Sequence, residues 1–203
     1  KVKGIEDMPR EIFGPVLHVA TFKASEIDKV IATINATGYG LTFGLHSRID
    51  DRVQHIVDGL HVGNTYVNRN QIGAVVGSQP FGGEGLSGTG PKAGGPHYLT
   101  RFTRAPAPEA TLDDAVTTSI EVGKALAAPM AASPSQAQDM PGPTGESNRL
   151  TLTPRAPLLC LGPGRAAALA QAEAVRKLGG QAVEAPGLVP DALASLTGFS
   201  GAI

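Results

Sequence analysis

The segment from Gly63 to Leu99 contains ten glycines and three prolines. Flexible linkers consist mainly of Gly and Ser, whereas this segment includes apolar side chains that favour burial, among them Val75, Val76 and Phe81. Glycines let backbone N–H groups approach a ligand closely, and neighbouring N–H groups can form an anion-binding nest. The composition favours a packed loop that binds a carboxylate beside Phe81. The alternative is an irregular loop that only connects two elements.

A second candidate site lies in the sequence EIFGPV, from Glu11 to Val16. A carboxylate at the turn before a strand can accept hydrogen bonds from the paired hydroxyls of a ribose, and a nearby aromatic ring can pack on a flat ring. Glu11 and Phe13 therefore form a candidate nucleotide contact. The plainer alternative is a surface acid followed by a core phenylalanine.

Cys160 is the only cysteine, and therefore the only candidate thiol nucleophile, in the 203 residues. It lies in the apolar sequence LLCLG, with no histidine after His97 and no base close in sequence. A thiol in an apolar strand is usually buried and inert. We therefore predict that Cys160 is structural and not catalytic.

The sequence GPGRAA, from Gly162 to Ala167, resembles the start of the G-x-G-x-x-G turn that binds dinucleotide phosphates. Ala167 stands where the third glycine belongs, and Glu184 is the only acid that ends the next predicted strand. These departures favour a Rossmann-like βαβ unit without a ligand.

The charge balance is nearly neutral, with 17 Lys and Arg against 18 Asp and Glu, and no basic cluster is interleaved with aromatics. Nucleic-acid binding through these residues is therefore not expected. The five histidines lack the spacing of metal ligands, so no metal site is predicted. No apolar run approaches the roughly 20 residues that span a bilayer, and a lone cysteine suits a reducing compartment, so we expect a cytoplasmic protein.

Predicted strands and helices alternate along the first half of the chain. Residues 16–22, 41–47 and 63–68 are predicted strands. Two amphipathic helices are predicted from apolar residues on one helical face, which are Ile27, Val30, Ile31 and Ile34 in one and Val53, Ile56, Val57 and Leu60 in the other. The alternation predicts an α/β fold with a mainly parallel sheet. Residues 97–104 are predicted as a further strand.

Composition changes near residue 105. Residues 105–148 are rich in Ala, Pro, Ser and Thr, which predicts a linker with one short helix at 112–126. Beyond residue 149, the pattern predicts an apolar strand at LLCLG, a helix closed by Gly179 and a strand at QAVEAP. A further helix at PDALASL and a strand at FSGAI are also expected. The predicted domains are therefore 1–104, 105–148 and an incomplete 149–203.

Four motifs, EIFGPVL, YGLTFGLHSR, GNTYVN and QPFGG, follow one another between Glu11 and Gly83. In this order they resemble the C-terminal part of an aldehyde dehydrogenase catalytic domain. The longer sequence from Asn68 to Leu99 resembles that of glutamate semialdehyde (pyrroline-5-carboxylate) dehydrogenases and, among these, of bifunctional proline utilisation A (PutA) proteins. The resemblance is strong over residues 1–104. A weaker resemblance of the last part, to the extra Rossmann-like domain of long PutA proteins, implies a non-catalytic lid.

The resemblance implies a role for each candidate site residue. In this family a cysteine thiolate attacks the aldehyde and a hydride passes to NAD. Glu11 would hold the nicotinamide ribose, with Phe13 beside the nicotinamide. Gly73 and Ala74 would anchor the carboxylate of glutamate semialdehyde through backbone N–H groups, and Phe81 would flank its carbon chain. Some relatives have Ser in place of Ala74, so here a hydroxyl contact with the carboxylate is missing.

The resemblance also implies a larger protein. The nucleophile and the base would lie outside this chain, in a missing N-terminal part of the same polypeptide that also carries FAD-dependent proline dehydrogenase. Residues 97–104 would join a dimerisation flap in a homo-oligomer, and peripheral membrane association would concern only the full-length bacterial protein. Two alternatives stay open: a monofunctional semialdehyde dehydrogenase with an extra tail, and a non-enzymatic oligomerisation scaffold.

Overall fold

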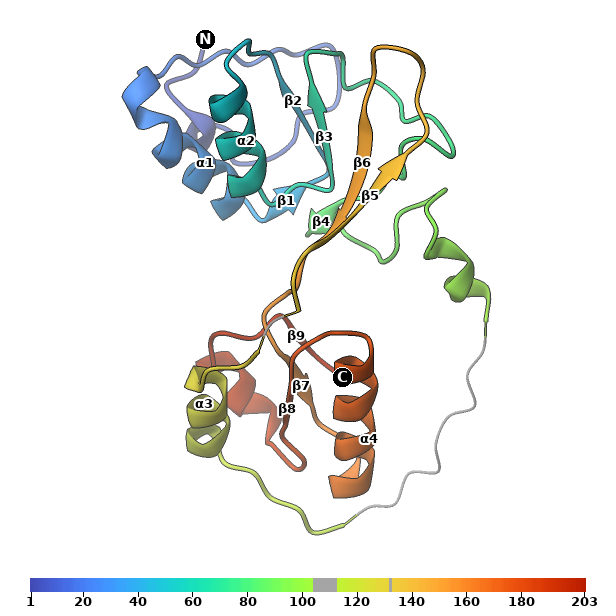
Figure 1. The fold of residues 1–203 in the computed structure, drawn as a ribbon. Helices are drawn as coiled ribbons and strands as arrows, with labels where there is room; N and C mark the ends of the chain where they lie inside the picture. Colours follow the sequence, from blue (N-terminus) through green and yellow to red (C-terminus); the bar gives the residue numbers. More distant parts are fainter. Residues whose placement is uncertain (104–112, 132) are drawn as a thin grey trace. The chain divides into compact units, whose positions relative to one another are not determined.

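The computed structural model describes residues 1–103, 113–131 and 133–203, which form two compact units (Figure 1). Unit 1 comprises residues 1–103 and 140–148, and unit 2 comprises residues 104–139 and 149–203. Both units combine helices with short sheets, and parallel strand pairs occur in each. The predicted α/β class is therefore confirmed as a mixed fold with small parallel sheets.

Unit 1 is built around two helices and one parallel strand pair. Strands β2 (Thr42–Leu45) and β3 (Asn64–Val67) are joined by α2 (Asp50–Gly59). Helix α1 (Ile27–Ala36) precedes them. The repeat of three to four residues between apolar side chains places one face of each helix inward, and the buried core consists of Ile31, Ile56 and Leu60. All four of these elements were predicted from the sequence.

The remaining elements of unit 1 are short. Strand β1 (Tyr39–Gly40) pairs in antiparallel fashion with β4 (Glu84–Gly85), which returns the glycine-rich segment to the body of the unit. Three single-turn 3-10 helices complete the unit, at Ile5–Asp7, Ala24–Glu26 and Tyr98–Phe102.

The predicted strand at residues 16–22 is wrong. These residues adopt no regular structure, and their backbone contact to another described segment is a single hydrogen bond from the Val2 N–H to the Val19 carbonyl, 2.9 Å long. Leu17 and Phe22 are exposed. A β-rich sequence becomes a strand only when a neighbouring strand pairs with it, and no such ladder forms within the described part of the chain.

The strand predicted at residues 97–104 is also wrong over residues 97–103, the part that the structure describes. Tyr98–Phe102 is a 3-10 helix in which the rings of Tyr98 and Phe102 meet edge to face at 5.8 Å. The Thr100 hydroxyl donates to the His97 carbonyl at 2.7 Å, and the Thr103 hydroxyl donates to the Thr100 carbonyl at 2.8 Å. Such local side-chain bonds compete with a strand ladder.

Unit 2 contains a three-stranded parallel sheet in the order β8-β7-β9. Strands β7 (Leu158–Cys160) and β8 (Ala182–Glu184) are joined by α4 (Gly164–Lys177), and β9 (Gly201–Ala202) follows a 3-10 helix at Pro190–Ser195. Small side chains let α4 pack closely on the sheet. The residues with no exposed surface are Leu159, Cys160, Ala168, Ala172 and Ala185. The strands and helices predicted here are confirmed, except that the segment at Pro190 is 3-10 helical.

The segment predicted as a linker contains more structure than expected. Helix α3 (Ser119–Ala127) begins where Thr118 and Glu121 form a capping box, so it starts later than the predicted helix at 112–126. Residues 104–112 lie outside the described residues. Strands β5 (Gln136–Met140) and β6 (Asn148–Leu152) were both missed, and together they form a hairpin (Figure 1). The turn of this hairpin belongs to unit 1.

Candidate functional site

The loop that contains Gly73 and Ala74 starts directly after β3. Asn68 takes a left-handed conformation with φ of 56°, which a short polar side chain tolerates. Its amide accepts a hydrogen bond from the Ser47 N–H at 3.0 Å and donates one to the Ser47 carbonyl at 2.9 Å. The chain therefore leaves the sheet at a fixed point and continues as the Arg69–Gln79 loop.

Within the described residues, the adjacent N–H groups of Gly73 and Ala74 have no protein partner, and neither do those of residues 69–71, 76 and 77 in the same loop. Gly73 has φ of 72° and open space around it, since no atom lies within 4 Å of where a Cβ would be. Adjacent N–H groups at a left-handed residue are the elements of an anion nest.

The donors on either side of this pair are fixed by side chains. The Ile72 N–H donates to Oδ1 of Asn70 at 3.1 Å, and the Val75 N–H donates to Oε1 of Gln79 at 3.1 Å. The Gln79 N–H returns a bond of 2.8 Å to the Val75 carbonyl. Val75 is therefore held to Gln79 through both its N–H and its carbonyl.

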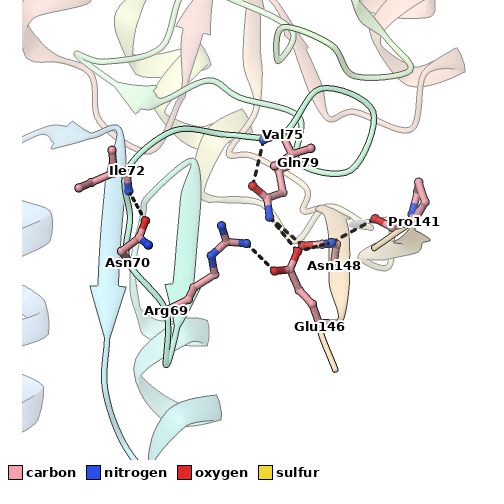
Figure 2. Close-up of polar contacts among 8 residues, drawn as sticks. All are labelled: Arg69, Asn70, Ile72, Val75, Gln79, Pro141, Glu146 and Asn148. Carbon is pink, nitrogen blue, oxygen red and sulfur yellow. Dashed lines mark hydrogen bonds and ion pairs between the residues drawn. The ribbon is translucent and has the colours of Figure 1, made fainter. Parts of the chain in front are cut away.

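Four side chains from distant parts of the sequence form a polar cluster at the ends of this loop (Figure 2). Glu146, from the turn of the β5–β6 hairpin, accepts from Nη1 of Arg69 at 2.7 Å, from Nε2 of Gln79 at 3.0 Å and from Nδ2 of Asn148 at 2.9 Å. Gln79 is only 7% exposed. Because all four belong to unit 1, the cluster is part of one compact body.

Phe81 follows the loop and has a fixed backbone. Its N–H donates to the Ala93 carbonyl at 3.0 Å, and the Ala93 N–H donates to the Phe81 carbonyl at 2.8 Å. The side chain is half-buried. The backbone of Phe81 is thus fixed a few residues after the Gly73 and Ala74 N–H groups, and the side chain remains partly accessible.

Lys92 holds the segment around Phe81 against the start of β3. Its ammonium donates to the Gly63 carbonyl, to the Gly82 carbonyl at 2.6 Å and to Oδ1 of Asn64 at 3.3 Å. Burial lowers the pKa of Lys92, and the neighbouring Glu84 opposes this shift. The ammonium acts as a clamp between two backbone segments.

Glu11 and Phe13 are not joined to the Arg69–Gln79 loop. Both are exposed, and the Phe13 ring is 92% exposed. Within the described residues, Glu11 takes part in no hydrogen bond or ion pair. The alternative of a core phenylalanine is thus wrong for this chain.

The predicted burial of Cys160 is confirmed. The side chain has no exposed surface in β7, and burial raises the pKa of its thiol above the ordinary value. The thiolate is the nucleophilic form, so this environment disfavours a role in attack on a substrate.

The glycine turn after β7 is occupied by groups of the chain itself. Gln171 accepts from the Gly162 N–H at 3.0 Å, and Asp113 accepts from the N–H of Arg165, the second residue of α4, at 2.8 Å. The hydrogen bonds from Arg165 and Ala115 lower the pKa of Asp113. An amide that a phosphate would use at a helix N-terminus is therefore bonded to a carboxylate.

Glu184, the acid at the end of β8, is paired as well. Its Oε1 accepts from both terminal nitrogens of Arg176 at 3.1 Å. In a dinucleotide fold this acid would bind ribose hydroxyls. Together with the filled glycine turn, the pairing leaves the βαβ unit without the free groups that such a ligand needs.

Sequence reasoning missed the residues that hold the loop. Gln79 and Lys92 could have been noticed as polar residues inside a segment interpreted as packed. Glu146 has no local signal, because its partners Gln79 and Arg69 lie 67 and 77 residues away.

Two absences apply to the described residues alone. No group of three or more His, Cys, Asp or Glu side chains in residues 1–103, 113–131 and 133–203 could hold a metal ion. In the same ranges, every helix is too short or too polar to cross a membrane.

Comparison with known proteins identifies several relatives. The chain is 43% identical over 211 residues to the Bifunctional protein PutA of Salmonella typhimurium, which covers 90% of this chain and 16% of that protein. It is 48% identical over 105 residues to the 1-pyrroline-5-carboxylate dehydrogenase of Bacillus thuringiensis, which covers 52% of this chain and 20% of that protein. The chain thus spans about a sixth to a fifth of the length of these relatives.

A solved structure shares the fold over most of the chain. Proline Utilization A (PutA) from Corynebacterium freiburgense matches 95% of this chain and 23% of its own, with a TM-score of 0.51 and 22% identity. The family model described as "Aldehyde dehydrogenase family" matches residues 5–107, which include the Arg69–Gln79 loop and Phe81. The chain therefore belongs to the aldehyde dehydrogenase family.

Proposed function

We propose that this chain supplies the substrate-anchoring part of an NAD-dependent dehydrogenase that oxidises glutamate γ-semialdehyde to glutamate. The proposal depends chiefly on one observation, the adjacent unpaired N–H groups of Gly73 and Ala74 in a loop whose neighbouring donors are fixed. A relative named 1-pyrroline-5-carboxylate dehydrogenase, which is 48% identical over 105 residues, supports the choice of substrate.

The two N–H groups would bind the carboxylate of the substrate. Hydrogen bonds from N–H donors to a carboxylate are charge-assisted and stronger than neutral ones. Ala74 offers no hydroxyl, so the backbone alone provides these bonds. The exposed apolar side chains of Ile72 and Val76 flank the donors in sequence, and they would exclude water once the substrate is bound.

Phe81 would contact the carbon chain between the carboxylate and the aldehyde. Its ring is half-buried and its backbone is held by Ala93 and, through Gly82, by Lys92. An aromatic ring offers a large apolar surface at a low cost in conformational entropy. Phe81 would thus favour a substrate whose middle part is an aliphatic chain.

Glu11 and Phe13 fit a contact with NAD. Glu11 has no protein partner in the described part of the chain, so its carboxylate is free to accept ribose hydroxyls, and the exposed Phe13 ring can pack on the nicotinamide. NAD, when bound, accepts the hydride that leaves the substrate.

The reaction also needs groups that we assign to other parts of a longer polypeptide. The only cysteine of the chain is buried, so we propose that the nucleophile and the general base lie outside these 203 residues. The match to PutA covers 90% of the chain, against 52% for the dehydrogenase alone, and this favours a bifunctional protein with FAD-dependent proline dehydrogenase elsewhere.

The remaining proposals concern the organisation of this larger protein. We propose domains at 1–104 and 149–203 joined by 105–148, with the last as a non-catalytic, Rossmann-like lid. The filled glycine turn at Gly162 supports the absence of a dinucleotide there. A homo-oligomer in the cytoplasm, with peripheral membrane association only of the full-length protein, completes the proposal.

The test uses the full-length polypeptide that contains these residues. Glutamate semialdehyde and NAD should yield NADH, and Phe81→Ala should raise the KM for the semialdehyde because part of the apolar wall is lost. Phe102→Ala is the control, since its exposed ring lies on a separate 3-10 helix and KM should not change. Absence of NADH formation by the wild type would disprove the function, and an unchanged KM would disprove the role of Phe81 alone.

A further inference from the structure

The Glu146 carboxylate joins the two ends of the Arg69–Gln79 loop. One oxygen, Oε2, accepts from Arg69 at the start of the loop at 2.7 Å, and the other, Oε1, accepts from Gln79 at its end at 3.0 Å. Figure 2 shows the three side chains converging, with the loop passing through Val75 above them. A single side chain from the hairpin turn therefore contacts both ends of the loop.

The environment of Arg69 and Glu146 strengthens the contact that holds the start of the loop. The side chains of Arg69 and Glu146 are each less than a third exposed, so water weakens the pair less than it would at an open surface. The Arg69 guanidinium also lies over the Tyr66 ring at 5.4 Å, which ties it to a buried residue of β3. The start of the loop is thus fixed to the sheet.

Gln79 connects Glu146 to the part of the loop that contains the unpaired Gly73 and Ala74 N–H groups. Its amide oxygen accepts from the Val75 N–H, while its amide nitrogen donates to Glu146. The Val75 N–H belongs to the peptide that follows Ala74, so fixing this peptide leaves only φ and ψ of Ala74 between it and the preceding peptide, which carries the Ala74 N–H. A glutamine meets both demands, because the N–H can only donate and the carboxylate can only accept.

The hairpin turn that carries Glu146 is itself ordered by hydrogen bonds from the Asn148 side chain. Asn148 donates from Nδ2 to the Pro141 carbonyl at 3.1 Å and to Glu146 at 2.9 Å. The carboxylate is therefore held on the turn before it meets its partners in the loop. This preorganisation reduces the side-chain entropy lost in forming the contact.

We infer that Glu146 is a positioning residue for recognition of the substrate carboxylate: through Gln79 and Arg69 it fixes the loop so that the Gly73 and Ala74 N–H groups converge on one anion. The inference rests on the proposed function and adds to it a residue outside the glycine-rich segment. Loss of Glu146 should impair aldehydes that carry a carboxylate and spare those that lack one.

The experiment measures kcat/KM of the full-length protein for glutamate semialdehyde and for pentanal, which has no carboxylate. In Glu146→Ala the ratio of the two values should fall about tenfold, as expected for one lost hydrogen bond to a charged group. The fall should lie mainly in the KM for the semialdehyde. Glu146→Gln, which keeps the size and one acceptor, should show a smaller fall and covers the case in which the alanine variant folds poorly.

Asp139→Ala is the matched control. Asp139 lies on the same hairpin and forms an exposed pair with Arg149 at 3.4 Å, and it has no hydrogen bond to the loop in the described residues, so the ratio should keep its wild-type value. A ratio unchanged in both Glu146 variants, or an equal loss for both aldehydes, would overturn the inference.

Hydrogen exchange separates this inference from the proposed function. The Val75 amide should exchange faster in Glu146→Ala than in the wild type, whichever substrate the enzyme uses, because Gln79 is no longer held. Wild-type protein that does not oxidise the semialdehyde would refute the proposed function, and unchanged exchange at Val75 would refute the positioning role.

Discussion

Each unit contains a parallel strand pair joined by a helix, β2-α2-β3 in unit 1 and β7-α4-β8 in unit 2, and each has a glycine-containing loop after one of these strands. After β7, the donors of Gly162 and Arg165 are bonded to side chains of the chain itself. After β3, the donors of Gly73 and Ala74 have no partner within the described residues. The same local topology thus gives one loop whose donors are bonded within the chain and one in which two adjacent donors are unpaired.

The core of unit 2 and the glycine-rich segment of unit 1 also differ in the contacts that hold them. The sheet of unit 2 is packed by fully buried apolar residues such as Leu159 and Ala172. In unit 1, the fixed points of the glycine-rich segment are polar, namely Asn68, Lys92 and Glu146. An apolar core tolerates little change in volume, whereas a polar clamp depends on single hydrogen bonds. Mutations should therefore act differently in the two units.

The largest expected effect is in the core of unit 2. Leu159→Ala should lower the free energy of unfolding of this unit by about 3 kcal/mol, because a side chain with no exposed surface leaves a cavity. Chemical denaturation followed by circular dichroism measures it. Leu169→Ala, at a nearly half-exposed position of α4, is the control and should cost about 1 kcal/mol or less. Equal losses would contradict the assignment of the core.

In unit 1, Lys92→Met should cost about 2 kcal/mol, because the Gly63 and Gly82 carbonyls lose their ammonium donor while the length of the side chain is kept. The melting temperature of the variant reports the loss. Lys177→Met, at an exposed position of α4, should leave that temperature unchanged. If Lys92→Met were neutral, unit 1 would not depend on this polar clamp.

The sequence predicted the elements whose signal is local. The apolar spacing of Ile27, Ile31 and Ile34 was sufficient for α1, and the run LLCLG was sufficient for β7. The segments 16–22 and 97–104 have the composition of strands, yet a strand also needs a partner, which composition does not specify. Strand β5 was missed because most of its side chains are exposed and lack an apolar pattern.

The candidate site shows a similar division. Residue types alone suggested a carboxylate-binding loop with Phe81 beside it, but Gly73 and Ala74 were singled out only through the resemblance to a family. Their role stays a prediction. The contacts of Glu146 span 67 and 77 residues, and no local rule connects a hairpin turn to a loop so far away in the sequence.

A smaller effect is expected from Gly73→Ala, which tests the open loop directly. A residue with a Cβ pays about 1 kcal/mol for the left-handed conformation at φ of 72°, although the space around it is free. The variant should bind glutamate, the product of the proposed reaction, more weakly, as measured by product inhibition. Gly198→Ala, with φ of 84° and equally free space in unit 2, should lose similar stability but bind glutamate normally.

The smallest effect concerns the filled turn of unit 2. Hydrogen bonds from Arg165 and Ala115 lower the pKa of Asp113 in the folded state, so its contribution to stability is present above the ordinary value of 3.8 and is lost as the pH falls through the lower, folded value. Asp113→Asn should therefore be slightly less stable than wild type at neutral pH and equal to it in strong acid. Asp114→Asn, at an exposed neighbour, is the control and should melt at the wild-type temperature at neutral pH.

The large sequence separation between Glu146 and its partners has a consequence for the order of folding. During synthesis, Arg69 and Gln79 leave the ribosome well before Glu146, since 77 and 67 residues separate them. The helices and the β2–β3 pair of unit 1 can form early from nearby residues. The Arg69–Gln79 loop gains its hydrogen bonds to Glu146 only after the hairpin has formed. We therefore expect Val75 to be among the last amides of unit 1 to become protected in pulse-labelled refolding, so that the loop proposed to bind the substrate carboxylate becomes ordered after the surrounding fold.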